Sequence, residues 1–143
     1  MLSKNNNDMN EAKLFQIPKI LDERGNLSFI ERGNDIHFDF KRVYWIYDVP
    51  GGEIRGGHAF REQEEIIVSL SGSFDVVLHN GMTECLFSLN RSFVGLYVPK
   101  MYWRSMQNFS TNAVAMVLAS TFYDENDYIH DFETFLKMQN KNA

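Results

Sequence analysis

Hydrophobic segments along the chain are short, and turn-forming residues separate them at intervals of roughly eight to twelve residues. This spacing is typical of all-β sandwiches and barrels. The dipeptide Asn80-Gly81 adds a hairpin signal, because it is favoured in type I′ turns, whose two central residues take positive φ. The strands predicted from these segments cover residues 27–30, 42–47, 65–70, 74–79, 82–88, 93–98, 103–109 and 113–119.

Only the end of the chain shows a helical pattern. Within residues 126–138, the apolar residues Ile129, Phe132, Phe135 and Leu136 recur at helical spacing. Acidic residues near the start of this segment suit a helix N-terminus, where the helix dipole is positive. We therefore predict an all-β fold, a small antiparallel barrel with a short C-terminal helix.

The chain has 143 residues, a length that suits one domain better than two. Hydrophobic residues make up 44% and charged residues 23%, a profile typical of soluble globular proteins. We place a single domain at residues 11–138, between tails at residues 1–10 and 139–143. The first tail is polar and lacks the apolar core of a signal peptide, and no segment approaches the roughly 20 apolar residues that cross a bilayer. We expect a cytoplasmic protein with no membrane partner.

The charge balance limits the ligands that the protein can bind. A formal net charge of -5 at pH 7 disfavours a broad nucleic-acid surface, so an anionic ligand would have to meet a local group of arginines. The single cysteine, Cys85, excludes an internal disulfide and fits a reducing compartment, and we expect its thiol to be buried and inert.

The most specific pattern lies between Gly52 and Gly72. Five residues separate Gly52 from His58, and Phe60, Glu65 and Gly72 follow two, five and seven positions further on in turn. This spacing resembles the first motif of the cupin (jelly-roll, RmlC-like) barrel. The one departure is Phe60, which stands where the motif has its second histidine.

A second segment, residues 99–108, resembles the other cupin motif, with Met101 in place of a glycine and Arg104 in place of a histidine. In metal cupins, three histidines and a glutamate converge on one cation. Phe60 has no lone pair to donate, and Arg104 stays protonated and would repel a cation. We therefore predict that the site binds no metal and that the protein uses no cofactor.

Beyond the barrel motifs, the chain resembles the metal-free cupin sugar 3,4-ketoisomerases over residues 15–136. The stretches that carry this resemblance are residues 41–44, 55–59, 94–98, 103–104, 117–120 and 123–129. The resemblance implies migration of the keto group of a thymidine-diphosphate (dTDP)-linked 4-keto-6-deoxyhexose from C4 to C3, without a redox cofactor. The product would supply 3-amino-3,6-dideoxyhexoses for surface polysaccharide. The resemblance also implies a homodimer, often with exchanged N-terminal strands.

The resemblance assigns roles to residues of this chain. His58 is the base that moves the proton, a task that suits a histidine near neutral pH, and Tyr44 lies beside it. Arg24, Arg55 and Arg104 would contact the anion and the carbonyl oxygen. The family's second histidine would stand at Phe60. Its loss leaves open a non-catalytic cupin that binds nucleotide sugars, whereas a metal-dependent dioxygenase or epimerase is disfavoured.

Alternatives remain open for three further candidate residues. Glu65 either holds His58 in one tautomer, pairs with Arg104, or lies at a solvated strand end. Tyr102 and Trp103 either stack on the thymine base or pack within the barrel.

The remaining histidines receive no catalytic role from the sequence. His37 and His130 lie outside both motifs, and we expect them at the surface or in packing. His79 lies at the predicted hairpin tip and is expected to be exposed.

Overall fold

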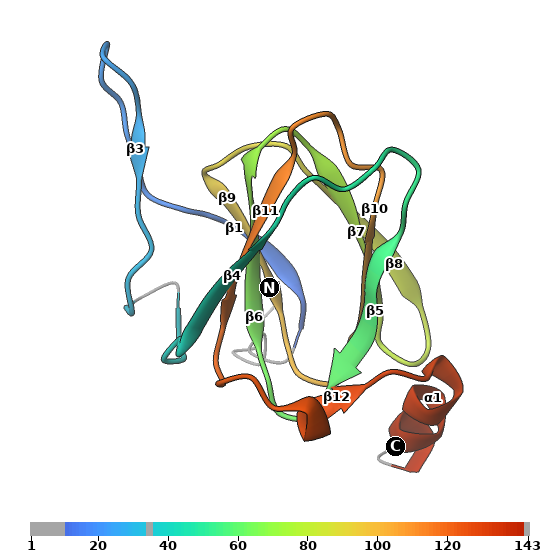
Figure 1. Ribbon diagram of the computed structural model, residues 1–143. Helices are drawn as coiled ribbons and strands as arrows, with labels where there is room; N and C mark the ends of the chain where they lie inside the picture. Colours follow the sequence, from blue (N-terminus) through green and yellow to red (C-terminus); the bar gives the residue numbers. More distant parts are fainter. Residues whose placement is uncertain (1–10, 34–35, 142–143) are drawn as a thin grey trace, which may run out of the picture.

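The computed structural model describes residues 11–33 and 36–141, and the predicted N-terminal tail lies outside these ranges. Two five-stranded antiparallel sheets face each other (Figure 1), in the orders β1-β9-β6-β11-β4 and β12-β5-β10-β7-β8. The strands are β1 (Lys13–Gln16), β2 (Lys19–Ile20), β3 (Leu27–Ser28), β4 (Arg42–Ile46), β5 (Arg55–Phe60), β6 (Glu65–Ser71), β7 (Phe74–His79), β8 (Glu84–Leu89), β9 (Val94–Val98), β10 (Trp103–Gln107), β11 (Val114–Ala119) and β12 (Tyr128–Ile129).

Burial follows the side-chain alternation of the strands. In β7, Phe74, Val76 and Leu78 are buried and the residues between them are not, because successive side chains of a strand point to opposite faces. The inward residues of both sheets form one core, which includes Ile67 of β6 and Met106 of β10. The predicted antiparallel all-β class is confirmed, although the strands form two separate sheets rather than a closed barrel.

The first sheet is also covered on its outer face. In β6, the side chains that alternate with those of the main core join a second cluster with Phe38 and Leu118. Five successive residues of β6 are therefore buried, as expected for a strand covered on both faces. The buried centre of the fold lies here, beside the site described below.

Strand β5 is absent from the strands predicted from the sequence, and Gly56 and Gly57 both lie within it. Gly56 has a φ of +75°, and a Cβ atom there would lie 2.8 Å from Nη1 of Arg104. A glycine at this position therefore permits a close approach between two paired strands, rather than a chain reversal.

The predicted hairpin at Asn80-Gly81 is present between β7 and β8. Within it only Gly81 takes positive φ, at 102°, so the turn is not the predicted type I′. The Asn80 side chain accepts hydrogen bonds from the backbone N–H groups of Met82 and Thr83 instead. Cys85 follows on β8 and is exposed, so the expected burial of its thiol was wrong.

The C-terminal helix begins later than the sequence pattern predicts. Helix α1 spans Phe132–Lys141, and the preceding residues form a short 3-10 helix at Glu125–Asp127 and strand β12. Strand pairing between β12 and β5 removes this segment from the helix, and Asp131 caps α1 by accepting a hydrogen bond from the Thr134 backbone N–H at 2.9 Å. No helix within the described ranges has the length and apolar character needed to cross a membrane.

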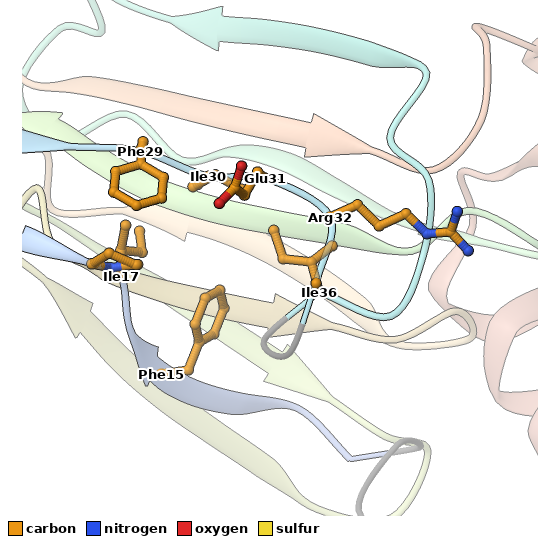
Figure 2. A pocket seen from close by; sticks show the side chains of 9 residues that line it. Phe15, Ile17, Phe29, Ile30, Glu31, Arg32 and Ile36 are labelled. Carbon is orange, nitrogen blue, oxygen red and sulfur yellow. The ribbon is translucent and has the colours of Figure 1, made fainter.

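The paired strands β2 and β3 form a hairpin arm that projects away from the two sheets (Figure 1). Ile20, Leu21 and Leu27 of this arm are 55%, 69% and 55% exposed. Figure 2 shows the pocket at the base of the arm, where Phe15, Ile17, Phe29 and Ile36 surround a space of about 310 Å³. None of the predicted site residues lines this pocket.

Candidate functional site

A second cavity, of about 400 Å³, opens where the two sheets fail to close into a barrel. Strand β4 forms one edge of the first sheet, and β12 and β5 form the facing edge of the second. Four of the residues predicted from the sequence line this cavity together, namely Tyr44, Arg55, His58 and Arg104. Residues far apart in the chain thus meet at one opening.

His58 lies on β5 directly opposite Arg104 of β10. Its Nε2 atom is buried and has no hydrogen-bond partner within the described ranges. Burial, followed by the positive charges of Arg104, His130 and Arg55, lowers the pKa of His58 to about 3. The ring is therefore neutral at physiological pH, so one of its two nitrogens carries a free lone pair, which is what a general base requires.

Behind His58, Arg104 and Glu65 form a buried ion pair, with exposed fractions of 2% and 1%. Arg104 Nε lies 2.6 Å from Glu65 Oε2, and Arg104 Nη2 donates to Glu65 Oε1 at 3.1 Å. Burial works against the charge of Arg104, but the adjacent Glu65 and Tyr44 outweigh it and raise the pKa of the guanidinium. Arg104 therefore stays protonated at the base of the cavity, with its charge balanced by Glu65.

Tyr44 completes this buried network. Its hydroxyl donates to Glu65 Oε1 at 2.6 Å and accepts from Arg104 Nη2 at 2.7 Å. Burial raises the pKa of Tyr44, and the charge of Glu65 adds to this effect while that of Arg104 opposes it. The net result is a raised pKa, so the hydroxyl keeps its proton. Of the three alternatives left open for Glu65, the structure shows the ion pair with Arg104. Gln63 also donates a hydrogen bond to Glu65 Oε1 at 2.8 Å.

Phe60 packs as an apolar residue beside the site. It is 4% exposed, and its ring lies edge-on to His58 with centroids 4.9 Å apart. The Arg104 guanidinium lies over the same ring, 5.7 Å from its centroid. Phe60 therefore shields the base from water without offering a proton donor or acceptor of its own.

The donor set around the cavity does not suit a metal ion. Within the described ranges, no group of three or more His, Cys, Asp or Glu side chains is placed to hold one. Glu65, the carboxylate of the motif, is paired with the Arg104 guanidinium. A cation bound there would have to displace that pair and would be repelled by Arg104.

Of the other four predicted residues, Glu65 lies behind the cavity in its pair with Arg104, and three lie elsewhere. Arg24 lies in the hairpin arm, where its guanidinium pairs with Asp22 at 2.9 Å. Trp103 packs beside helix α1, its ring centroid 5.3 Å from that of Phe132. Tyr102 lines a separate small pocket near β8. The locations of Tyr102 and Trp103 agree with packing, one of the two alternatives left open by the sequence.

The cavity is also lined by residues that the sequence patterns had not indicated. They are Arg42, Trp45, Ile46, Tyr47, Gly56 and Tyr128. Strand alternation could have indicated Arg42, because it lies two positions before Tyr44 and therefore on the same face of β4. Tyr128 had been assigned to a helix, so its place opposite Phe60 could not be foreseen.

Sequence comparison shows similarity over almost the whole chain. The family model described as FdtA: WxcM-like, C-terminal, matches residues 10–140. A curated protein from Aneurinibacillus thermoaerophilus, TDP-4-oxo-6-deoxy-alpha-D-glucose-3,4-oxoisomerase, is 44% identical over 127 residues. The aligned part covers 89% of this chain and 91% of that protein.

Solved structures show the same similarity in three dimensions. The crystal structure of a 3,4-ketoisomerase from Helicobacter canadensis has a TM-score of 0.88 at 41% identity and covers 91% of this chain and 98% of that one. A mutant of the 3,4-ketoisomerase QdtA from Thermoanaerobacterium thermosaccharolyticum, in complex with TDP-4-keto-6-deoxyglucose, has a TM-score of 0.89 at 35% identity. That comparison covers 93% of this chain and 96% of the other.

Proposed function

From the premise that the chain belongs to the FdtA family of cupin-fold sugar-nucleotide 3,4-ketoisomerases, we propose that His58 transfers the proton that lets the keto group move from C4 to C3. The observation that carries this proposal is the Nε2 atom of His58, which is buried at the cavity and has no partner within the described ranges. A neutral imidazole in this position can take the proton from C3 and return it to C4.

Removal of the C3 proton leaves negative charge on the oxygen at C4, and that charge has to be stabilised. The Arg104 guanidinium supplies a positive charge next to His58 and an Nη1 donor that has no partner within the described ranges. The Tyr44 hydroxyl, which donates its proton to Glu65, helps to hold the guanidinium. Their mutual bonds and those to Glu65 fix them before substrate enters. Preorganised groups of this kind lower the barrier because they need no rearrangement during the reaction.

The substrate that we assign is a dTDP-linked 4-keto-6-deoxyhexose, which one solved relative holds in complex. Arg55 is exposed on the rim of the cavity, and Arg42 lies further along its wall. Arginines bind phosphate oxygens through paired N–H donors, which suits the diphosphate of a nucleotide sugar. The product would supply 3-amino-3,6-dideoxyhexoses of surface polysaccharide, and its synthesis would take place in the cytoplasm.

We assign no metal to this reaction. Phe60 and Arg104 stand at two of the positions that would carry ligands, and Arg104 neutralises the remaining carboxylate. The chemistry asked of the site is proton transfer, which side chains can perform without a Lewis acid. Full activity after exhaustive dialysis against EDTA agrees with this assignment, and a stoichiometric transition metal in the active protein contradicts it.

The hairpin arm points to a homodimer. A two-stranded hairpin is marginally stable alone in water. Among the described residues, β2 and β3 pair only with each other, and exposed apolar side chains lie at Ile20, Leu21 and Leu27. Trp45 and Tyr47, which line the cavity, are also exposed, at 60% and 58%. Packing of the arm against a second copy of the chain would cover such surfaces, and would carry Arg24 away from its own subunit.

Proton NMR in deuterated water tests the assigned reaction. The purified protein is incubated with dTDP-4-keto-6-deoxyglucose, and the signals at C3 and C4 are followed. We expect a 3-keto product with deuterium incorporated at the carbon that receives the proton. Binding of the nucleotide sugar with neither product nor exchange at C3 would overturn the proposal.

A further inference from the structure

Four rings lie together where β12 pairs with β5. Tyr128 is directly opposite Phe60, and the next pair in this antiparallel register is Ile129 with Ala59. Continued by one residue, the same register brings His130 beside His58, and their ring centroids are 6.3 Å apart. Directly opposed residues of an antiparallel pair share one face, so His130 lies on the face of the pair that carries His58.

Two contacts hold the His130 ring in place. It stacks on Tyr128 with an interplanar angle of 12° and centroids 5.3 Å apart. Its Nε2 atom lies 2.7 Å from Glu125 Oε1. Hydrogen bonds from Tyr123 and His130 lower the pKa of Glu125, so this partner is a carboxylate at neutral pH. The His130 side chain does not line the cavity itself, but it is 59% exposed and lies beside His58 and Tyr128, which do line it.

The contact with Glu125 determines which nitrogen is available. Because Nε2–H donates to the carboxylate, Nδ1 is the atom left to accept or release a proton. His130 can therefore alternate between a proton donor and a proton acceptor at one position.

The other two histidines of the chain are placed elsewhere. His37 binds Glu64 at 3.0 Å and packs against Tyr97 in the layer that covers the first sheet. His79 packs against Phe132 of helix α1. His130 is thus the one further histidine whose ring contacts His58.

We propose that His130 is a second catalytic residue, which exchanges a proton with the two sugar oxygens while His58 acts on the two carbons. The inference rests on the proposed function. An isomerase that moves a carbonyl between neighbouring carbons must also move a proton between their oxygens. Phe60 has no group that could do so, and the structure assigns that task to a ring from the neighbouring strand.

With two histidines, every proton that moves in the reaction has a donor and an acceptor. In the first half, His58 takes the proton from C3, the C3–C4 double bond forms, and the oxygen at C4 takes a proton from the His130 imidazolium. In the second half, the oxygen at C3 returns a proton to His130 as its carbonyl forms, and C4 takes the proton from His58. Both histidines end in their starting states, and no redox partner is required.

The variant His130→Asn separates this role from that of His58. Because residue 130 is exposed, the substitution leaves the core intact. With dTDP-4-keto-6-deoxyglucose in deuterated water, we expect the rate of 3-keto product formation to fall by about 100-fold. The rate of hydrogen exchange at C3, the step that His58 performs, should fall by a factor at least ten times smaller than the rate of product formation does.

The matched control is His37→Asn, which removes another histidine paired with a glutamate, outside the cavity. It should leave both rates unchanged. Product formation by His130→Asn at the wild-type rate, or equal losses of exchange and product, would overturn the assignment of His130. A wild-type protein that shows neither exchange nor product would instead refute the proposed function itself.

Discussion

At the scale of the residue, His58 is set apart by its surroundings. Its Nε2 atom is buried without a partner within the described ranges, and Arg104 lies opposite it on β10. We expect His58→Asn to lower turnover by at least about 100-fold, because the replacement amide cannot accept and return a proton at the substrate carbon. The proton NMR assay measures this, with circular dichroism to verify the fold. Turnover close to that of the wild type would remove His58 from the mechanism.

The same histidine links stability to pH. Burial and the charge of Arg104 lower the pKa of His58 to about 3 in the folded protein, whereas an unfolded chain has a histidine pKa of about 6.5. Between these values the unfolded state binds more protons, so the free energy of unfolding falls as pH falls from about 6.5 towards 3. Urea denaturation across this range should show a steeper decline for the wild type than for His58→Asn. Identical slopes would contradict the lowered pKa.

The buried pair of Arg104 and Glu65 carries a separate prediction. Removing one partner of a buried ion pair leaves the other charge uncompensated, which costs about 3–5 kcal/mol. We expect Glu65→Gln to lower the free energy of unfolding by about this amount, as measured by urea denaturation. The control is Glu62→Gln, which breaks an exposed contact with Lys100 of 3.6 Å and should change stability by less than about 1 kcal/mol. Equal effects of the two variants would contradict the role assigned to the buried pair.

At the scale of the element, β5 determines whether the site can form. It carries His58, pairs with both β10 and β12, and brings its backbone close to Arg104 at Gly56. The two adjacent glycines of this strand differ in a way that can be tested. A Cβ atom at Gly56 would lie 2.8 Å from Arg104 Nη1, but one at Gly57 would lie 3.6 Å from the Trp103 ring.

We therefore expect Gly56→Ala to lower activity at least about tenfold, because alanine is strained at a φ of +75° and its methyl group displaces Arg104. Gly57→Ala is the matched control, since its added methyl group makes an ordinary van der Waals contact. Steady-state kinetics of both variants measures the difference. An active Gly56→Ala protein would show that Arg104 does not need the position seen in the structure.

At the scale of the whole molecule, the projecting arm is the feature that one chain does not explain. If it packs on a second copy, a charge among its exposed apolar side chains should weaken that contact. We expect Leu21→Asp, at a site 69% exposed, to shift the protein from dimer to monomer in size-exclusion chromatography with light scattering. Met82→Asp is the control, because Met82 is 88% exposed in the β7–β8 turn. A wild-type monomer, or a dimer unaffected by Leu21→Asp, would refute this arrangement.

Much of the architecture followed from local signals. Strands such as β7 and β11 have strong hydrophobic patterns, so the antiparallel all-β class could be predicted from short segments. The start of α1 could not, because the apolar spacing that suggested a helix from residue 126 also serves β12, whose pairing with β5 is a tertiary contact. Strand β5 was missed for a similar reason, since local propensity assigns adjacent glycines to turns.

The sequence by itself indicated the candidate residues of the site: spaced motifs indicated His58, Glu65 and Arg104, the family resemblance added Tyr44, and the residue types at 60 and 104 argued against a metal. The tertiary structure decided which of these residues meet. It joined Arg104 to Glu65 in a buried pair and placed Trp103 outside the cavity. It also brought His130 to His58. The sequence specifies the identity of each side chain, but the proximity of distant residues depends on strand register, which only the folded sheets fix.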